Sequence, residues 1–172
     1  MQMRRSVGFS EWIPWASRHL LSDGKGVYLF ARCESLPPPE RADPIHRNVI
    51  YVGQCGTRFK ARWDLFDEGL NHPERVTQNP KHYPRASRYL ELYQPGTEPL
   101  YVATLTVEEL CDGFRNPGTL ALLDVDVTRA GAGLPVQAFL NANGDLLAKY
   151  VERRLILLYG VRYGRRPVIN RD

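Results

Sequence analysis

Short runs of apolar, aromatic and β-branched residues, bounded by Gly, Pro and polar segments, predict three β-strands. The runs extend from Gly26 to Ala31, from Asn48 to Gly53 and from Leu100 to Thr106. Their length and their content of Val, Ile, Leu, Tyr and Phe are typical of strands in a packed sheet. We therefore expect a small sheet of at least three strands.

The first two helices are predicted by apolar residues that recur at helical spacing. One spans residues 10–22, where Ser10 is a candidate N-cap and Pro14 falls in the first turn, a position that tolerates proline. The other follows the second strand and begins after Thr57, its candidate N-cap. Its apolar residues follow an i, i+4, i+7 pattern: Phe59, Trp63 and Phe66.

Two more helices are predicted in the second half of the chain. A short one covers about residues 85–93 and is stopped by Pro95-Gly96. The last begins at Asn143-Gly144-Asp145, carries Glu152 in its interior and is expected to end at Gly160. Its apolar residues follow helical periodicity: Leu146, Leu147, Tyr150, Val151, Leu155, Leu158 and Tyr159.

The segments between these elements form three apparent insertions in a single domain that covers residues 1–172. They span about residues 33–47, 69–98 and 107–144. The first is proline-rich and predicted to be an exposed loop, and the second is polar and turn-rich between residues 69 and 84. The third is acidic, and its stretch from Leu120 to Val127 is compatible with a helix or a strand.

Composition and charge narrow the class of protein. The chain has 172 residues, of which 43% are hydrophobic and 24% charged, as is usual for a globular domain. It shows neither a signal-peptide pattern nor an apolar run long enough to cross a membrane. Three cysteines without C-x-x-C spacing support no disulfide framework or zinc site. We expect a cytoplasmic protein that does not interact with a membrane.

The net charge of +4 is distributed unevenly along the chain. Residues 47–88 contain eight Lys or Arg and four Asp or Glu, and residues 145–172 contain seven and three. Residues 89–144 contain two and seven, so this segment is acidic. Two basic segments are what a polyanion-binding face requires. Charge alone is equally compatible with solvated surfaces.

Two tyrosine-bearing triplets lie in the first two predicted strands: Gly26-Val27-Tyr28 and Tyr51-Val52-Gly53. Arg62 follows the second tyrosine by 11 residues, and the chain closes with Glu152-Arg153-Arg154-Leu155-Ile156 and a terminal Pro-x-x-Asn that ends at Asn170. In order and spacing these residues resemble the GIY-YIG nuclease family. The interval before Arg62 is one residue longer than the family's usual spacing. This resemblance implies an α+β fold with a mainly antiparallel sheet flanked by helices.

The resemblance also implies a metal-dependent cleavage of phosphodiester bonds. Tyr28 would be the general base, supported by Tyr51, and would need positive charge nearby to lower the pKa of its phenol. Arg62 would hold the phosphate, and Glu152 would bind one divalent cation, Mg²⁺ or Mn²⁺. Asn170 would orient Glu152 or its neighbours.

One family position departs from the pattern. Some members have a histidine four residues after the arginine, where this chain has Phe66. The role is then absent, filled by another tyrosine, or supplied by the segment of residues 69–84 through His82 or Tyr83. His82 is included among the candidate catalytic residues.

The arrangement of a self-contained domain with insertions resembles the restriction endonucleases of the family. The leading hypothesis is a DNA endonuclease, which the resemblance allows to act as a homodimer. A structure-selective nuclease, an RNA-directed nuclease and a non-catalytic nucleic-acid-binding protein are the alternatives. The residues expected to contact nucleic acid are basic: Arg58, Lys60, Arg62, Arg153 and Arg166.

Overall fold

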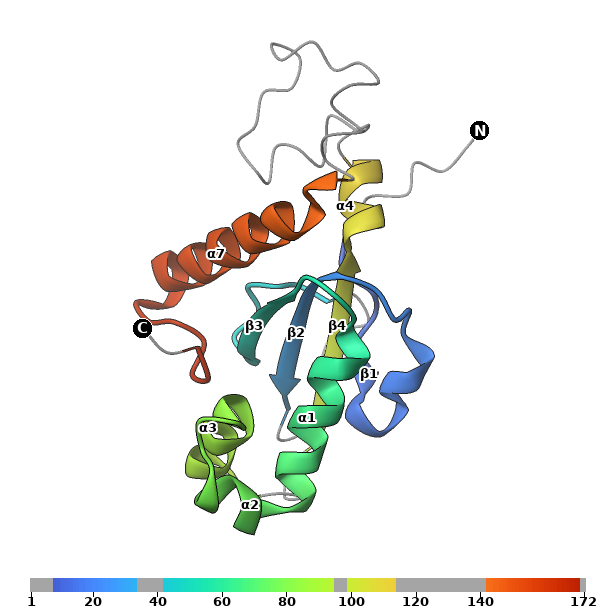
Figure 1. Cartoon of the computed structure of the whole chain (residues 1–172). Coiled ribbons are helices and arrows are strands. Elements are labelled where there is room, and N and C mark those ends of the chain that lie inside the picture. Colours follow the sequence, from blue (N-terminus) through green and yellow to red (C-terminus); the bar gives the residue numbers. More distant parts are fainter. Residues whose placement is uncertain (1–7, 34–41, 95–98, 114–141, 171–172) are drawn as a thin grey trace.

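The chain folds into three layers, a four-stranded antiparallel sheet with helices on both faces (Figure 1). This computed structural model describes residues 8–33, 42–94, 99–113 and 142–170. The strand order is β1-β4-β2-β3, and every neighbouring pair is antiparallel. The predicted α+β class is confirmed. The elements are β1 (Ile13–Pro14), η1 (Trp15–Leu20), β2 (Gly26–Arg32), β3 (Val49–Cys55), α1 (Phe59–Asn71), α2 (Pro73–Gln78), α3 (Pro84–Leu92), β4 (Leu100–Thr106), α4 (Val107–Gly113) and α7 (Gly144–Tyr163).

The central strand β2 is buried along its whole length because helices cover both sides of it. Alternate side chains of a strand point to opposite faces of a sheet. Val27 and Leu29 accordingly belong to the core cluster that includes Val151 and Leu155 of α7. Tyr28 belongs to the opposite cluster, which contains apolar residues of α1 and α3. The two faces therefore have separate cores.

The glycine of the first triplet is required where β2 begins beside β4. Gly26 has a φ of 152°, which L side chains rarely adopt. A Cβ atom at this position would also collide with the backbone oxygen of Leu105 and lie 2.9 Å from the Cα of Thr106. Glycine is thus the residue that lets β2 enter the sheet close to β4.

The free edge of β3 is closed by the last part of the chain. The backbone N–H of Ile169 donates to the carbonyl of Ile50 at 2.9 Å. The side chain of Asn170 accepts from the N–H of Val52 at 2.9 Å and donates to its carbonyl at 2.6 Å. An edge strand otherwise exposes such groups to other chains. The C-terminal tail therefore continues the sheet by local contacts.

Two predictions about the start of helices are wrong. Residues 10–22 do not form one helix, because Ile13–Pro14 pairs with β4 and only Trp15–Leu20 is helical, as a 3-10 helix. Thr57 does not cap α1; its hydroxyl lies 3.6 Å from the sulfur of Cys55. The capping oxygen comes from Asp23, which accepts the N–H of Lys60 at 3.0 Å.

The remaining elements agree with the expectations except at three places. The segment expected to be turn-rich contains α2, and α3 covers Pro84–Leu92, close to the predicted 85–93. The last helix continues past Gly160 to Tyr163, where Gly164 in a left-handed conformation ends it. The acidic insertion begins with α4, whereas the stretch from Leu120 to Val127 lies outside the described residues.

None of the helices in the described ranges is both long enough and apolar enough to cross a membrane.

The closure of the β3 edge predicts a structural effect of Asn170. Asn170→Ala removes both hydrogen bonds to Val52, so we expect the free energy of unfolding to fall by about 1–3 kcal/mol. Urea unfolding followed by circular dichroism measures this change. Asn71→Ala, which removes one exposed contact with Asp67, is the matched control and should change stability by less than about 0.5 kcal/mol. Equal stability of Asn170→Ala and the wild type would contradict the edge role.

Candidate active site

The two tyrosines of the triplets form a pair on neighbouring strands. Tyr28 lies opposite Gly53 in the β2–β3 register, and the rings of Tyr28 and Tyr51 are 5.7 Å apart. Both face the layer formed by α1 and α3. A Cβ atom at Gly53 would collide with the ring of Tyr51. The glycine of the second triplet therefore makes the space in which the Tyr51 ring lies.

Tyr28 is enclosed by aromatic side chains. It is 1% exposed, and its ring contacts those of Phe30, Phe59 and Trp63. Its hydroxyl is buried and makes no hydrogen bond of good geometry among the described residues, although the Tyr51 side chain is near enough to act on it. Burial raises the pKa of the Tyr28 phenol well above 10, and the neighbouring Tyr51 raises it further. Arg85 acts in the opposite direction but does not outweigh burial.

Arg85 is a site residue that the sequence analysis missed. It occupies the second position of α3, and its Nε donates a hydrogen bond to the Tyr51 hydroxyl at 2.6 Å. Its guanidinium carbon is 5.5 Å from the centroid of the Tyr51 ring. The residue is partly buried, and its pKa is raised by the tyrosines and by the charge of Glu152 against the effect of burial. No motif marks Arg85, and only the packing of α3 against β3 reveals it.

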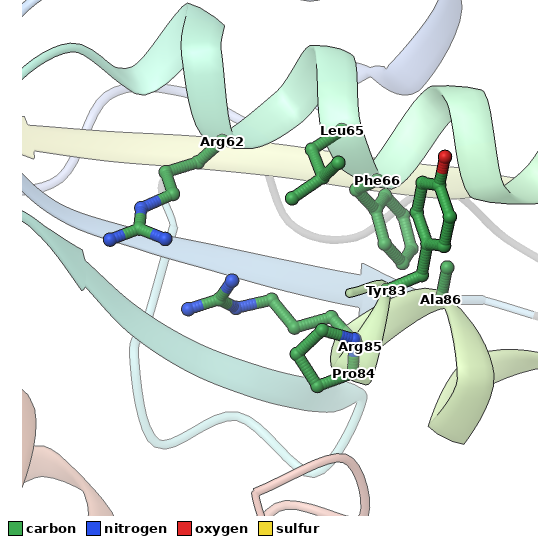
Figure 2. Close-up of a pocket in the computed structure, with 7 residues that line it drawn as sticks. All are labelled: Arg62, Leu65, Phe66, Tyr83, Pro84, Arg85 and Ala86. Atoms are coloured by element: carbon green, nitrogen blue, oxygen red, sulfur yellow. The ribbon is translucent and has the colours of Figure 1, made fainter. Parts of the chain in front are cut away.

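Arg62 and Arg85 line the same shallow, partly open pocket between α1 and α3, whose cavity volume is about 10 Å³. Figure 2 shows their two guanidinium groups extending from the two helices toward the same space. Arg62 is exposed on α1. The other lining residues are mostly apolar: Leu65, Phe66, Tyr83, Pro84 and Ala86. The pocket is therefore positively charged against an apolar wall.

Glu152 reaches this region from α7, the layer on the opposite face of the sheet. Its carboxylate accepts a hydrogen bond from the backbone of Gln54, at the end of β3. Burial raises the pKa of Glu152, while this hydrogen bond and the charges of Arg85 and Arg153 act to lower it. The carboxylate thus lies beside the free edge of the strand that carries Tyr51.

The residues around Glu152 fit a single hard cation. Within the described ranges there is no group of three or more His, Cys, Asp or Glu that could hold a metal ion. Mg²⁺ does not need such a group, because it keeps several waters and commonly binds one or two carboxylates. Gln54, whose backbone bonds Glu152, also has a buried side-chain oxygen without a hydrogen-bond partner in the described structure. An amide oxygen is a suitable second ligand.

Two of the predicted catalytic residues lie elsewhere or make other contacts. His82 is exposed and packs against Tyr83, with ring centroids 4.6 Å apart, and the described contacts do not bring it to the tyrosine pair. Asn170 bonds the backbone of Val52. Its partner Val52 is therefore two residues along β3 from Gln54, the residue whose backbone contacts Glu152.

The predicted nucleic-acid contacts are distributed over two elements and the tail. Arg58 and Lys60 lie at the start of α1, where they pair with Asp23 at 2.8 Å and Asp64 at 3.1 Å. Arg153 and Arg166 are exposed on α7 and in the C-terminal tail. All except Arg62 thus lie outside the pocket of Figure 2.

Comparison with known proteins identifies no relative: no family model, no curated protein and no solved structure matches this chain.

The unpartnered hydroxyl of Tyr28 predicts an unusual effect on stability. Tyr28→Phe removes a buried polar group that makes no hydrogen bond, so we expect unchanged stability or a gain of up to about 1 kcal/mol. Tyr83→Phe is the matched control, because its hydroxyl donates to Glu68 at 3.0 Å. The control should lose about 0.5–1.5 kcal/mol. Thermal and urea unfolding of both variants measure the difference. A marked loss of stability in Tyr28→Phe would show that the Tyr28 hydroxyl does make a stabilising hydrogen bond.

Proposed function

We propose that the protein is a metal-dependent endonuclease that hydrolyses phosphodiester bonds in DNA. The observation that carries this proposal is the grouping of Tyr51, Arg85 and Arg62 around one pocket, with the carboxylate of Glu152 near enough for its charge to act on Arg85. Tyr51 of β3 bonds Arg85 of α3, Arg85 shares a pocket with Arg62 of α1, and the charge of Arg85 acts on Glu152 of α7. Ordinary packing explains each residue singly but gives no reason for cations, a carboxylate and tyrosines to converge.

The chemistry of phosphodiester hydrolysis assigns a role to each group. The transition state accumulates negative charge on the phosphoryl oxygens, which the permanent charge and planar fork of Arg62 are suited to stabilise. Glu152, with the side-chain oxygen of Gln54, would hold one Mg²⁺. When bound, that ion supplies charge neutralisation and a more acidic water. The resemblance of the triplets, Arg62 and Glu152 to the GIY-YIG family supports the same assignment.

Tyr51 is a better candidate than Tyr28 for the group that orients or deprotonates the attacking water. The Tyr28 hydroxyl is enclosed by aromatic rings, and burial raises its pKa, which opposes the role expected of it from the sequence. The Tyr51 oxygen instead accepts a hydrogen bond from Arg85, which lines the pocket. The role of Tyr28 is then to pack against the ring of Tyr51 and hold it in place.

The test of the proposed function is a cleavage assay with Glu152→Gln. Supercoiled plasmid, linear DNA and RNA are incubated with the full chain in Mg²⁺ or in EDTA, and the product ends are mapped. We expect Mg²⁺-dependent cleavage of DNA by the wild type and by Glu108→Gln, an exposed control on α4. Cleavage should be lost in Glu152→Gln, because the charge that holds the ion is removed. DNA binding without any cleavage would favour the non-catalytic alternative.

The same variant has an expected gain in stability. Because burial raises the pKa of Glu152, the folded protein binds this proton more tightly than the unfolded chain. Ionised Glu152 therefore lowers the free energy of unfolding at neutral pH. Glu152→Gln should unfold at a higher temperature than the wild type at pH 7. The difference should shrink as the pH falls through the raised pKa and disappear below both pKa values.

A melting curve for Glu152→Gln that matches the wild type at every pH would contradict the burial of this carboxylate. Glu108→Gln again serves as the exposed control.

The assignment of the tyrosines is tested by the cleavage rates of two conservative variants. Tyr51→Phe removes the oxygen that contacts Arg85 and should lower the single-turnover rate by about 10²–10⁴, the usual contribution of a positioned general base. Tyr28→Phe should have a much smaller effect. If Tyr28→Phe lowers the cleavage rate more than Tyr51→Phe does, Tyr28 is the general base instead.

A further inference from the structure

Arg85 and Arg62 differ from the other arginines of the α1–α3 region in their partners. Arg58, Arg75 and Arg88 form ion pairs with Asp23, Glu68 and Glu91 at 2.8, 2.6 and 2.8 Å. Neither Arg62 nor Arg85 has an ion pair with a carboxylate in the described structure, and the side-chain hydrogen bond of Arg85 goes to the hydroxyl of Tyr51. Two positive charges thus lie at one pocket, and the carboxylate of Glu152 acts on Arg85 only from beyond ion-pair distance.

The helices add to this positive charge. Arg62 lies in the first turn of α1 and Arg85 in the first turn of α3, and neither turn contains an acidic residue. The start of a helix carries partial positive charge, where a cation is unfavourable and an anion is stabilised. Neither helix has a side-chain hydrogen bond from its N-cap residue. At the start of α1 the Asp23 carboxylate accepts the N–H of Lys60, whereas no such cap is described for α3, so the helix start that adds positive charge beside Arg85 is that of α3.

The geometry of Arg85 leaves its outer nitrogens available. Its Nε is engaged by the Tyr51 hydroxyl at 2.6 Å, which fixes the plane of the guanidinium. The guanidinium groups of Arg85 and Arg62 extend to the same side in Figure 2, and neither terminal nitrogen of Arg85 makes a hydrogen bond among the described contacts. Paired N–H groups of this kind match two oxygens of a tetrahedral phosphate.

Phe66 forms an apolar part of the pocket wall. It is 3% exposed and stacks on Phe30 with centroids 4.8 Å apart. It is part of the core and offers no polar group to a ligand. The charged groups that line the pocket are therefore Arg62 and Arg85.

We propose that Arg62 and Arg85 together bind one internal phosphate of a nucleic-acid backbone, as a two-armed clamp. The choice of a backbone phosphate rests on the proposed function, whereas the affinity of the clamp for phosphate does not. Through its Nε, Arg85 also holds Tyr51 beside the bound phosphate, so binding and positioning share one side chain.

The clamp is tested by binding in EDTA, where cleavage is absent. Inorganic phosphate and a single-stranded DNA oligonucleotide, with and without a 5′-phosphate, are titrated into the full chain by calorimetry. Arg62→Met and Arg85→Met should each weaken binding of the oligonucleotide by about tenfold or more and abolish the rise in melting temperature caused by phosphate. Arg88→Met, on the same helix as Arg85, is the matched control and should bind as the wild type does.

Arg85→Lys keeps the positive charge but loses the fork and the bond to Tyr51, so it should retain part of the affinity. Arg85→Lys also serves as the test variant if Arg85→Met does not fold. Affinity equal to the wild type in Arg85→Met, or in Arg85→Lys if the Met variant does not fold, would overturn the clamp. Binding that requires the 5′-phosphate would overturn the choice of an internal phosphate.

The outcomes separate the clamp from the proposed function. Arg85-dependent binding of phosphate by a protein that cleaves nothing would support the clamp and refute the nuclease. Mg²⁺-dependent cleavage that is unaffected in Arg85→Met, with unchanged KM and kcat, would support the nuclease and refute the clamp.

Discussion

The arrangement of the site depends on the free edge of β3. The outward backbone groups of an edge strand must find partners or remain open to other chains. Here the carbonyl of Ile50, both backbone groups of Val52 and the backbone of Gln54 are bonded by Ile169, Asn170 and Glu152. These three strand residues alternate along β3, and their partners all come from α7 and the tail. The edge therefore ties the end of the chain to the strand that carries Tyr51.

This constraint changes how Glu152 and Asn170 are interpreted. Both satisfy backbone groups of the edge strand, so their presence has a structural explanation before any catalytic one is invoked. The same contacts also fix where a carboxylate from α7 can lie, since the Gln54 backbone holds Glu152 at the end of β3. The contact that satisfies the edge therefore also determines how near the Glu152 carboxylate lies to Arg85.

The sequence predicts the parts of the site that depend on local pattern. Runs of strand-forming residues place Tyr28 and Tyr51 on paired strands, and both triplet glycines are needed where a Cβ would collide with Leu105 or Tyr51. Contacts between distant segments were not predictable. Asp23 replaces Thr57 as the capping group of α1, and Arg85 reaches Tyr51 across 34 positions of the chain. Such contacts are determined by how helices pack on the sheet, which no periodicity encodes.

The aromatic floor beneath the pocket affects the strength of the charges above it. Tyr28, Phe30, Phe59 and Trp63 form a continuous set of ring contacts that includes a stacked pair 5.5 Å apart. Such a floor excludes water from one side of the site, and charges interact more strongly where the surroundings are less polar. The hydroxyl of Tyr28 and the indole nitrogen of Trp63 are both buried within this floor without a hydrogen bond among the described residues. Burial raises the pKa of the Tyr28 phenol, so it stays neutral beside Tyr51 and leaves Arg85 as the charged group next to this tyrosine pair.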